Sequence, residues 1–112
     1  MQHKEYKTTI NIPIYEEQLV IIFTSDLNKS LAKLKEPPMV ASGVIIDKED
    51  RLIILFPINF FNYQVAVHEA YHAMRNILNS RDIHDEETEA YLLDFIFGNI
   101  EKQFLKIKSK FQ

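Results

Sequence analysis

Two stretches in the second half of the chain decide the fold: residues 62–79, NYQVAVHEAYHAMRNILN, and residues 85–107, DEETEAYLLDFIFGNIEKQFLKI. In both stretches apolar residues recur three and four positions apart, as in a helix with one face on a core. Residues 79–82 interrupt this pattern, and Asp85 has the side chain of a helix N-cap. We therefore expect two long C-terminal helices that are joined by a short loop and packed antiparallel.

The first half of the chain is rich in β-branched residues and predicts a small sheet. Its candidate strands are residues 10–14, 19–23, 40–46 and 52–56, with a polar hairpin loop between the last two. A short helix is expected over residues 25–34, where leucines recur at helical spacing before a Pro-Pro pair. The predicted fold class is therefore α+β: a small, mostly antiparallel sheet with a short helix, followed by two long C-terminal helices.

Length and composition exclude several classes of protein. A chain of 112 residues supports one core, so we expect a single domain over residues 1–112. Because there is no cysteine, any metal must be held by histidine and carboxylate side chains. A formal charge of −3 predicts no nucleic-acid partner, and no apolar run is long enough to predict a membrane segment. Residues 1–9 do not resemble a secretory signal, so we expect a cytoplasmic protein.

His68, Glu69 and His72 form an HExxH motif inside the first of the two predicted helices. Residues four apart on a helix lie one turn above each other, so both imidazoles can present a nitrogen to the same ion. Glu69 then lies beside the ion, where its carboxylate can take a proton from zinc-activated water. The motif predicts His68 and His72 as metal ligands, Glu69 as general base and Zn²⁺ as the cofactor.

A third metal ligand is needed, since a catalytic zinc site takes three protein ligands and a water. The acidic start of the second helix is the obvious source, because a short loop folds it back toward His72. The candidates there are Glu86, Glu87 and Glu89, and periodicity does not choose among them. His84 in the loop is a further candidate. Each carboxylate also has a simpler role, which is to complement the positive end of the helix dipole.

The two predicted helices resemble those of small bacteriophage-encoded zinc metallopeptidases, a minimal gluzincin-like group. The resemblance lies in HEAYHA at residues 68–73 and DEETEAYL at residues 85–92, and it covers about a third of the chain, residues 65–96. Aligned on the Ala-Tyr pair of the second segment, it implies Glu87 as the third zinc ligand. It also implies a hydrolase of the host cytoplasm whose partner is a peptide or protein substrate.

The resemblance further implies that an edge strand of the hairpin at residues 40–56 binds an extended peptide above the zinc. Two phenols, Tyr91 and Tyr71, are available as donors to the oxyanion, and we select Tyr91 as the catalytic residue. An alternative from another class is a phage-encoded, zinc-containing protein that binds a host partner without turnover. A third possibility is a structural module of two helices on a sheet, without metal.

Overall fold

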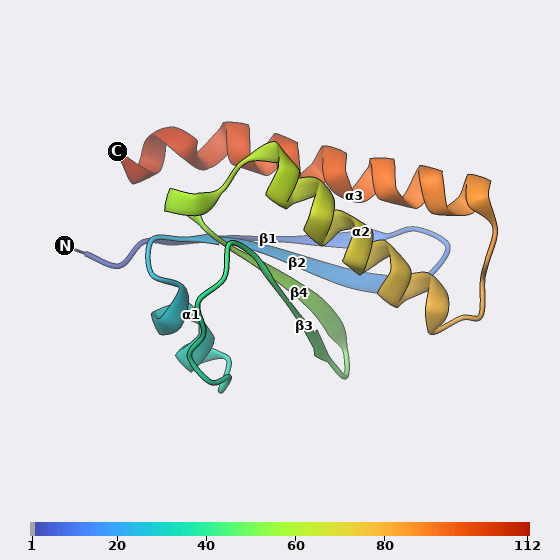
Figure 1. Cartoon of the computed structure of the whole chain (residues 1–112), viewed down its shortest axis with the longest axis horizontal. Helices are drawn as coiled ribbons and strands as arrows, with labels where there is room; N and C mark the ends of the chain where they lie inside the picture. The colour runs from blue at the N-terminus through green and yellow to red at the C-terminus, as the bar shows by residue number, and fades with distance from the viewer. Residues whose placement is uncertain (1) are drawn as a thin grey trace.

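The structure, a computed structural model, describes residues 2–112 as an α+β fold built on one four-stranded sheet (Figure 1). The strands are β1 (Glu5–Ile12), β2 (Glu17–Thr24), β3 (Val44–Lys48) and β4 (Arg51–Pro57). Their order is β1-β2-β4-β3, so β1 and β3 form the two edges. The β1–β2 and β3–β4 pairs are antiparallel, whereas the central β2–β4 pair is parallel. The expected mostly antiparallel sheet is confirmed, with one parallel pairing at its centre.

Helices cover both faces of this sheet (Figure 1). The short α1 (Leu27–Lys33) lies on one face, and the long α2 (Tyr63–Asn79) and α3 (Glu86–Ile107) lie together on the other. Two short 3-10 turns, Ile58–Phe60 and Lys108–Phe111, precede α2 and follow α3. The short helix and both long C-terminal helices are thus confirmed. Among residues 2–112, none of the helices has the length and apolar character that crossing a bilayer requires.

The central strands β2 and β4 are apolar along nearly their whole length because helices cover them on both sides. Alternate residues of these strands point to opposite faces, which divides the core into two layers. The layer under α2 and α3 includes Leu19, Ile21, Phe23, Leu52, Ile54 and Phe56. The layer under α1 includes Val20, Ile22, Ile53 and Leu55. The outer strands β1 and β3 are less completely buried than this central pair.

Two strands begin more than two residues away from their predicted starts. The strand expected at residues 10–14 spans residues 5–12, because Pro13 cannot donate a backbone hydrogen bond and a turn follows it. Ile14 in that turn has φ 74°, in the left-handed region that a β-branched residue rarely adopts. The strand expected at residues 40–46 begins only at Val44, since the segment before it is irregular.

Side-chain caps define the start of each long helix. Asn62 accepts a hydrogen bond from the Val65 backbone N–H at 2.9 Å, and Asp85 accepts one from the Thr88 N–H at the same distance. The loop between the helices is anchored by Arg81, whose Nη2 donates to the Tyr15 carbonyl at 2.6 Å. The helix pair is therefore held against the β1–β2 turn at the end where α3 begins.

Candidate functional site

The two histidines of the HExxH motif lie together on the outer, exposed face of α2. The Nε2 atoms of His68 and His72 are 3.2 Å apart, and their ring centroids are 4.5 Å apart. Two nitrogens bound to one tetrahedral ion at about 2.0–2.1 Å lie about 3.3 Å from each other. The pair therefore has the separation that a shared tetrahedral ion requires. Without an ion, one Nε2–H donates a hydrogen bond to the other ring.

Glu69 points to the side of α2 that faces the sheet edge, and it is 8% exposed. It packs against Gly43, the residue just before β3. A Cβ built on Gly43 would lie 2.8 Å from Cγ and 2.9 Å from Oε2 of Glu69, so only glycine leaves room for this carboxylate. Burial raises the pKa of the Glu69 carboxyl above its ordinary value, and the nearby His68 and His72 imidazoles offset this shift only in part.

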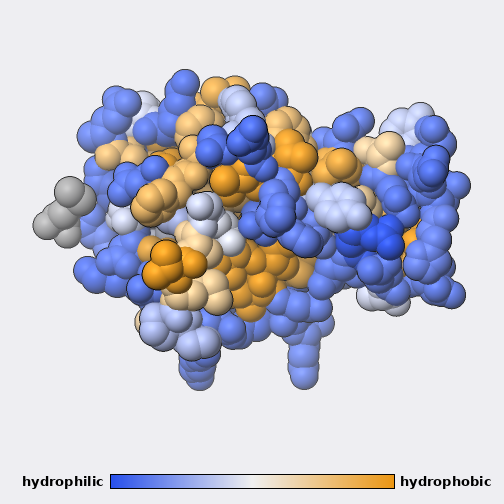
Figure 2. All heavy atoms as spheres, viewed as in Figure 1, coloured by the Kyte–Doolittle hydropathy of each residue, from blue (hydrophilic) through white to orange (hydrophobic). Residues whose placement is uncertain are grey.

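A groove opens between the first half of α2 and the segment that leads into β3. It has a volume of about 390 Å³ and is lined by Ser42, Gly43, Asn62, Gln64, Val65, His68 and Glu69. Glu69 and His68 therefore line the same open space. Apolar surface is exposed over the sheet below α2 in the view of Figure 2. The groove thus brings together a carboxylate and an imidazole.

The sheet edge beside this groove is β3, and within residues 2–112 no strand pairs with its outer side. Glu69 contacts Gly43 before β3, and further along the helix Asn76 Nδ2 donates to Asp47 Oδ2 near the end of β3 at 3.3 Å. Hence α2 and β3 run alongside each other in the same direction. An extended peptide could pair with the free edge of β3 and pass in front of Glu69.

The predicted carboxylate half of the metal site does not come together with the histidine pair. Among residues 2–112, no three His, Asp or Glu side chains lie close enough together to hold one ion. Glu86 and Glu87 are exposed in the first turn of α3. Glu89 instead accepts a hydrogen bond from Arg75 Nη1 at 2.6 Å, and His84 Nε2 lies 3.0 Å from Asp82 Oδ1.

The Arg75–Glu89 ion pair explains this separation, because it marks the register of two antiparallel helices. From this pair, His72 lies three residues toward the start of α2, and Glu87 lies two residues toward the start of α3. In antiparallel helices these are opposite directions. At about 1.5 Å per residue, they place His72 and Glu87 about 7–8 Å apart along the helix axes, in addition to the lateral spacing of the helices. Glu87 as the third ligand stays a prediction.

The two candidate oxyanion donors have different surroundings. Tyr91 is 72% exposed and lines an apolar hollow against the β1–β2 turn, which shares no residue with the groove of Glu69. Tyr71 has its ring centroid 6.0 Å from that of His72. Of the two tyrosines, Tyr71 therefore lies beside the histidine pair. The catalytic role of Tyr91 stays a prediction.

Gly43 forms part of the groove wall, and it was not among the site residues predicted from the sequence. The chain has only 2 glycines, and an isolated glycine at a β-rich segment is a known sign of close approach by another group. The isolated glycine therefore indicated a close approach at this position, but it did not identify the approaching group. The partner, Glu69, is 26 positions away in the sequence, so only the packing of α2 on the sheet identifies it.

Comparison with known proteins adds nothing to this site, since no family, no curated protein and no solved structure matches the chain. The resemblance to phage-encoded zinc peptidases therefore stays a prediction. The histidine pair, Glu69 and the groove beside β3 are the features that bear on function.

Proposed function

We propose that this chain is a metal-dependent hydrolase, specifically a zinc-dependent peptidase, in which His68 and His72 hold the ion and Glu69 is the general base. One observation carries the proposal. The two Nε2 atoms lie 3.2 Å apart on the same helix from which the Glu69 carboxylate enters a groove beside a free sheet edge. Two metal ligands, a general base and a free strand edge are three of the parts that such an enzyme needs, and a third metal ligand is the fourth.

Zn²⁺ bound there would supply Lewis acidity toward a scissile carbonyl. The chain's own residues would do the rest. Glu69 would take a proton from the attacking water and return it to the leaving amine. Its raised pKa favours the first of these steps, because a carboxylate whose pKa is higher accepts a proton more readily. The edge of β3 would hold the substrate backbone extended beside Glu69.

The third position of the metal site is left open in this proposal. Glu87 would have to approach the histidines by a shift of the first turn of α3, against the register marked by Arg75 and Glu89. That turn is exposed, and its cap consists of Asp85 and Thr88. The metal affinity of Glu87 variants tests this point separately from the role of the histidines.

A second candidate function is a zinc-containing protein that binds a partner without turnover. It is favoured by one observation, namely that no third donor accompanies His68 and His72 among residues 2–112. A two-histidine site binds an ion weakly and holds it exposed, which suits a contact surface as well as a catalyst. The partner would then occupy the free edge of β3, as a substrate would.

The test uses protein purified without chelator, its zinc content, and hydrolysis of a mixed library of fluorogenic peptides. We expect about one zinc per chain, and turnover that falls by at least about 100-fold in Glu69→Gln while zinc is retained. Zinc without turnover in either protein would support the binding function instead. If the protein binds no zinc when it is supplied with up to about 1 mM of the metal, both proposed functions are contradicted.

A further inference from the structure

A second cavity lies on the opposite face of the sheet, away from the HExxH groove. It has a volume of about 320 Å³ and lies between α1 and the strands β1, β2 and β4. The cavity exists because α1 has only 7 residues and covers part of that sheet face, leaving the rest to side chains. Its size is at the lower end of the range of pockets that hold small molecules, about 300–1,000 Å³.

The floor of this cavity is apolar. Thr9, Val20 and Ile53 are cross-strand neighbours on β1, β2 and β4, and all three line it. Val20 is 4% exposed and Ile53 is 1% exposed, so the floor is firmly packed. The Thr9 hydroxyl and the side-chain amide of Gln18 add neutral hydrogen-bonding groups at the rim.

Three cations surround this floor, each from a different element: Lys7 from β1, Arg51 from β4 and Lys33 from α1. Such a group contrasts with the net charge of −3 on the whole chain. Among residues 2–112, no carboxylate forms an ion pair with Lys7, and Arg51 has only its neighbour Asp50, at 3.9 Å and with a side chain that is 76% exposed. These two cations are therefore poorly neutralised.

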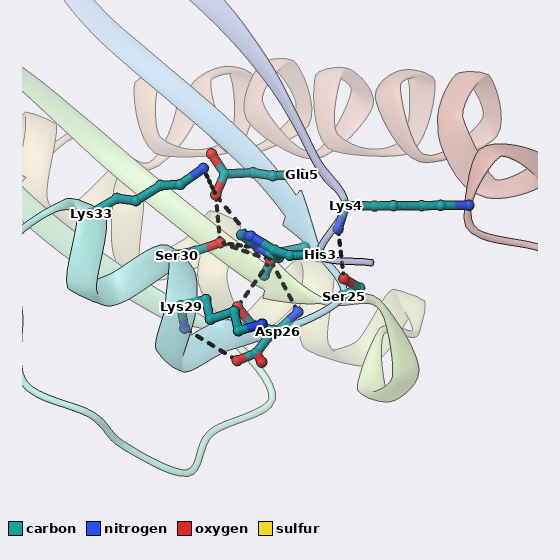
Figure 3. A network of polar contacts seen from close by, with 9 residues as sticks. His3, Lys4, Glu5, Ser25, Asp26, Lys29, Ser30 and Lys33 are labelled. Carbon is teal, nitrogen blue, oxygen red and sulfur yellow. Dashed lines mark hydrogen bonds and ion pairs between the residues drawn. The ribbon is translucent and has the colours of Figure 1, made fainter. Parts of the chain in front are cut away.

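One acid, Glu5, lines the cavity, but it is already engaged (Figure 3). Its Oε2 accepts a hydrogen bond from the Ser30 hydroxyl at 2.6 Å and lies 3.8 Å from Lys33 Nζ. The same Ser30 hydroxyl lies 3.3 Å from His3 Nε2, within a network that fixes the first strand to α1. Because Glu5 and Lys33 offset each other, and the mostly exposed Asp50 neutralises Arg51 only in part, Lys7 and Arg51 leave an excess of positive charge at the cavity.

We propose that this cavity binds a small ligand with a phosphate monoester and a short apolar group. The phosphate, with a charge of about −1.5 to −2 at pH 7, matches the excess charge of Lys7 and Arg51. The apolar group lies on Val20 and Ile53. The competing explanation is that the Lys and Arg stems only shield the apolar strands, with their charged ends in water. In that case no ligand is held. The proposal is independent of the HExxH site.

The test is an amide NMR titration at pH 7 and low salt with phenyl phosphate, inorganic phosphate and phenol as separate probes. We expect saturable shifts in β1, β2 and β4 with phenyl phosphate, weaker binding of inorganic phosphate and none of phenol. The Lys7→Gln/Arg51→Gln double variant should bind phenyl phosphate about tenfold more weakly or worse. The control, Lys102→Gln/Lys106→Gln, makes the same charge change on exposed positions of α3 and should retain binding.

Three results would overturn the proposal. The first is shifts that never saturate, and the second is an equal loss of affinity in both double variants. The third is shifts that lie outside the strands around the cavity. To separate loss of binding from loss of folding, Arg51→Lys keeps the charge and should retain most of the affinity. Each variant is also compared with the parent protein by thermal unfolding.

Discussion

The carboxylate of Glu69 lies so close to Gly43 that a methyl group on Gly43 would come within 2.9 Å of Oε2. This contact joins the HExxH helix to the segment that begins the free edge strand. It ties the position of the proposed general base to the wall of the groove. A change at Gly43 should therefore alter the position of Glu69, although the two residues lie far apart in the sequence.

Gly43→Ala should displace Glu69 and lower any hydrolytic turnover by about tenfold or more, because a misplaced base loses rate. Overpacking should also lower the free energy of unfolding by about 1–3 kcal/mol. Zinc affinity should be unchanged, since His68 and His72 are exposed. Activity, urea unfolding and zinc titration measure the three effects.

Gly98 is the matched control, because a Cβ there meets no atom within 4 Å. It lies inside α3, so Gly98→Ala should raise the free energy of unfolding by about 0.5–1 kcal/mol and leave activity unchanged. If both alanine variants were stabilised, with activity intact, the close contact of Gly43 and Glu69 would be contradicted.

Glu69→Gln should make the zinc-free protein more stable at pH 7. The pKa of this carboxyl is raised in the folded state above its ordinary 4.5, so the folded protein binds the proton more tightly than the unfolded chain. Ionisation therefore destabilises the fold as pH rises through 4.5 toward the higher folded pKa, and the penalty is fully present above it. Urea unfolding of parent and variant at pH 4 and pH 7 measures the difference.

The gain from Glu69→Gln should shrink toward pH 4, where the parent carboxyl is mostly protonated in both states. Glu49→Gln, at an exposed turn position, is the control and should show no such pH-dependent gain. An advantage of Glu69→Gln that is the same at both pH values would indicate that the amide packs better, and not that a buried charge is costly.

Zinc should raise the free energy of unfolding through the histidine pair. At about 100 times the dissociation constant, one bound ion stabilises the fold by about 2.7 kcal/mol. His68→Ala and His72→Ala should each abolish most of this gain without much effect on the zinc-free protein, since both residues are exposed. His84→Ala removes a histidine from the loop and should keep the zinc effect. If His84→Ala were the only one of these variants to lose the zinc effect, the zinc site would lie in that loop instead.

Glu87→Gln tests the third ligand. The register of the two helices in this structure predicts that the variant changes zinc affinity by less than about twofold, as expected for a carboxylate that contacts neither the ion nor its ligands. A loss of about tenfold or more would instead show that the start of α3 shifts to bring Glu87 to the ion. Calorimetric zinc titration distinguishes the two results.

Glu89→Gln is the companion variant to Glu87→Gln. It removes the ion pair with Arg75 and should cost about 0.2–1 kcal/mol of stability, as for other partly exposed pairs, with zinc affinity unchanged. A marked loss of zinc affinity in this variant alone would identify Glu89 as the ligand.

The sequence by itself determined the α+β class, the two long helices and the histidine pair. All three follow from local spacing: apolar residues three and four apart define a helix face, and two histidines four apart must lie one turn from each other. The β-branched apolar runs at residues 19–23 and 52–56 also predicted the strands β2 and β4.

Only the tertiary structure decided the register of Arg75 against Glu89, the contact of Glu69 with Gly43, and the cavity ringed by Lys7, Lys33 and Arg51. Periodicity places residues on a face of one element, but it contains no measure of how far one element slides along another. That distance is set by how the buried side chains of α2, α3 and the sheet interlock, which is a property of the packed core as a whole.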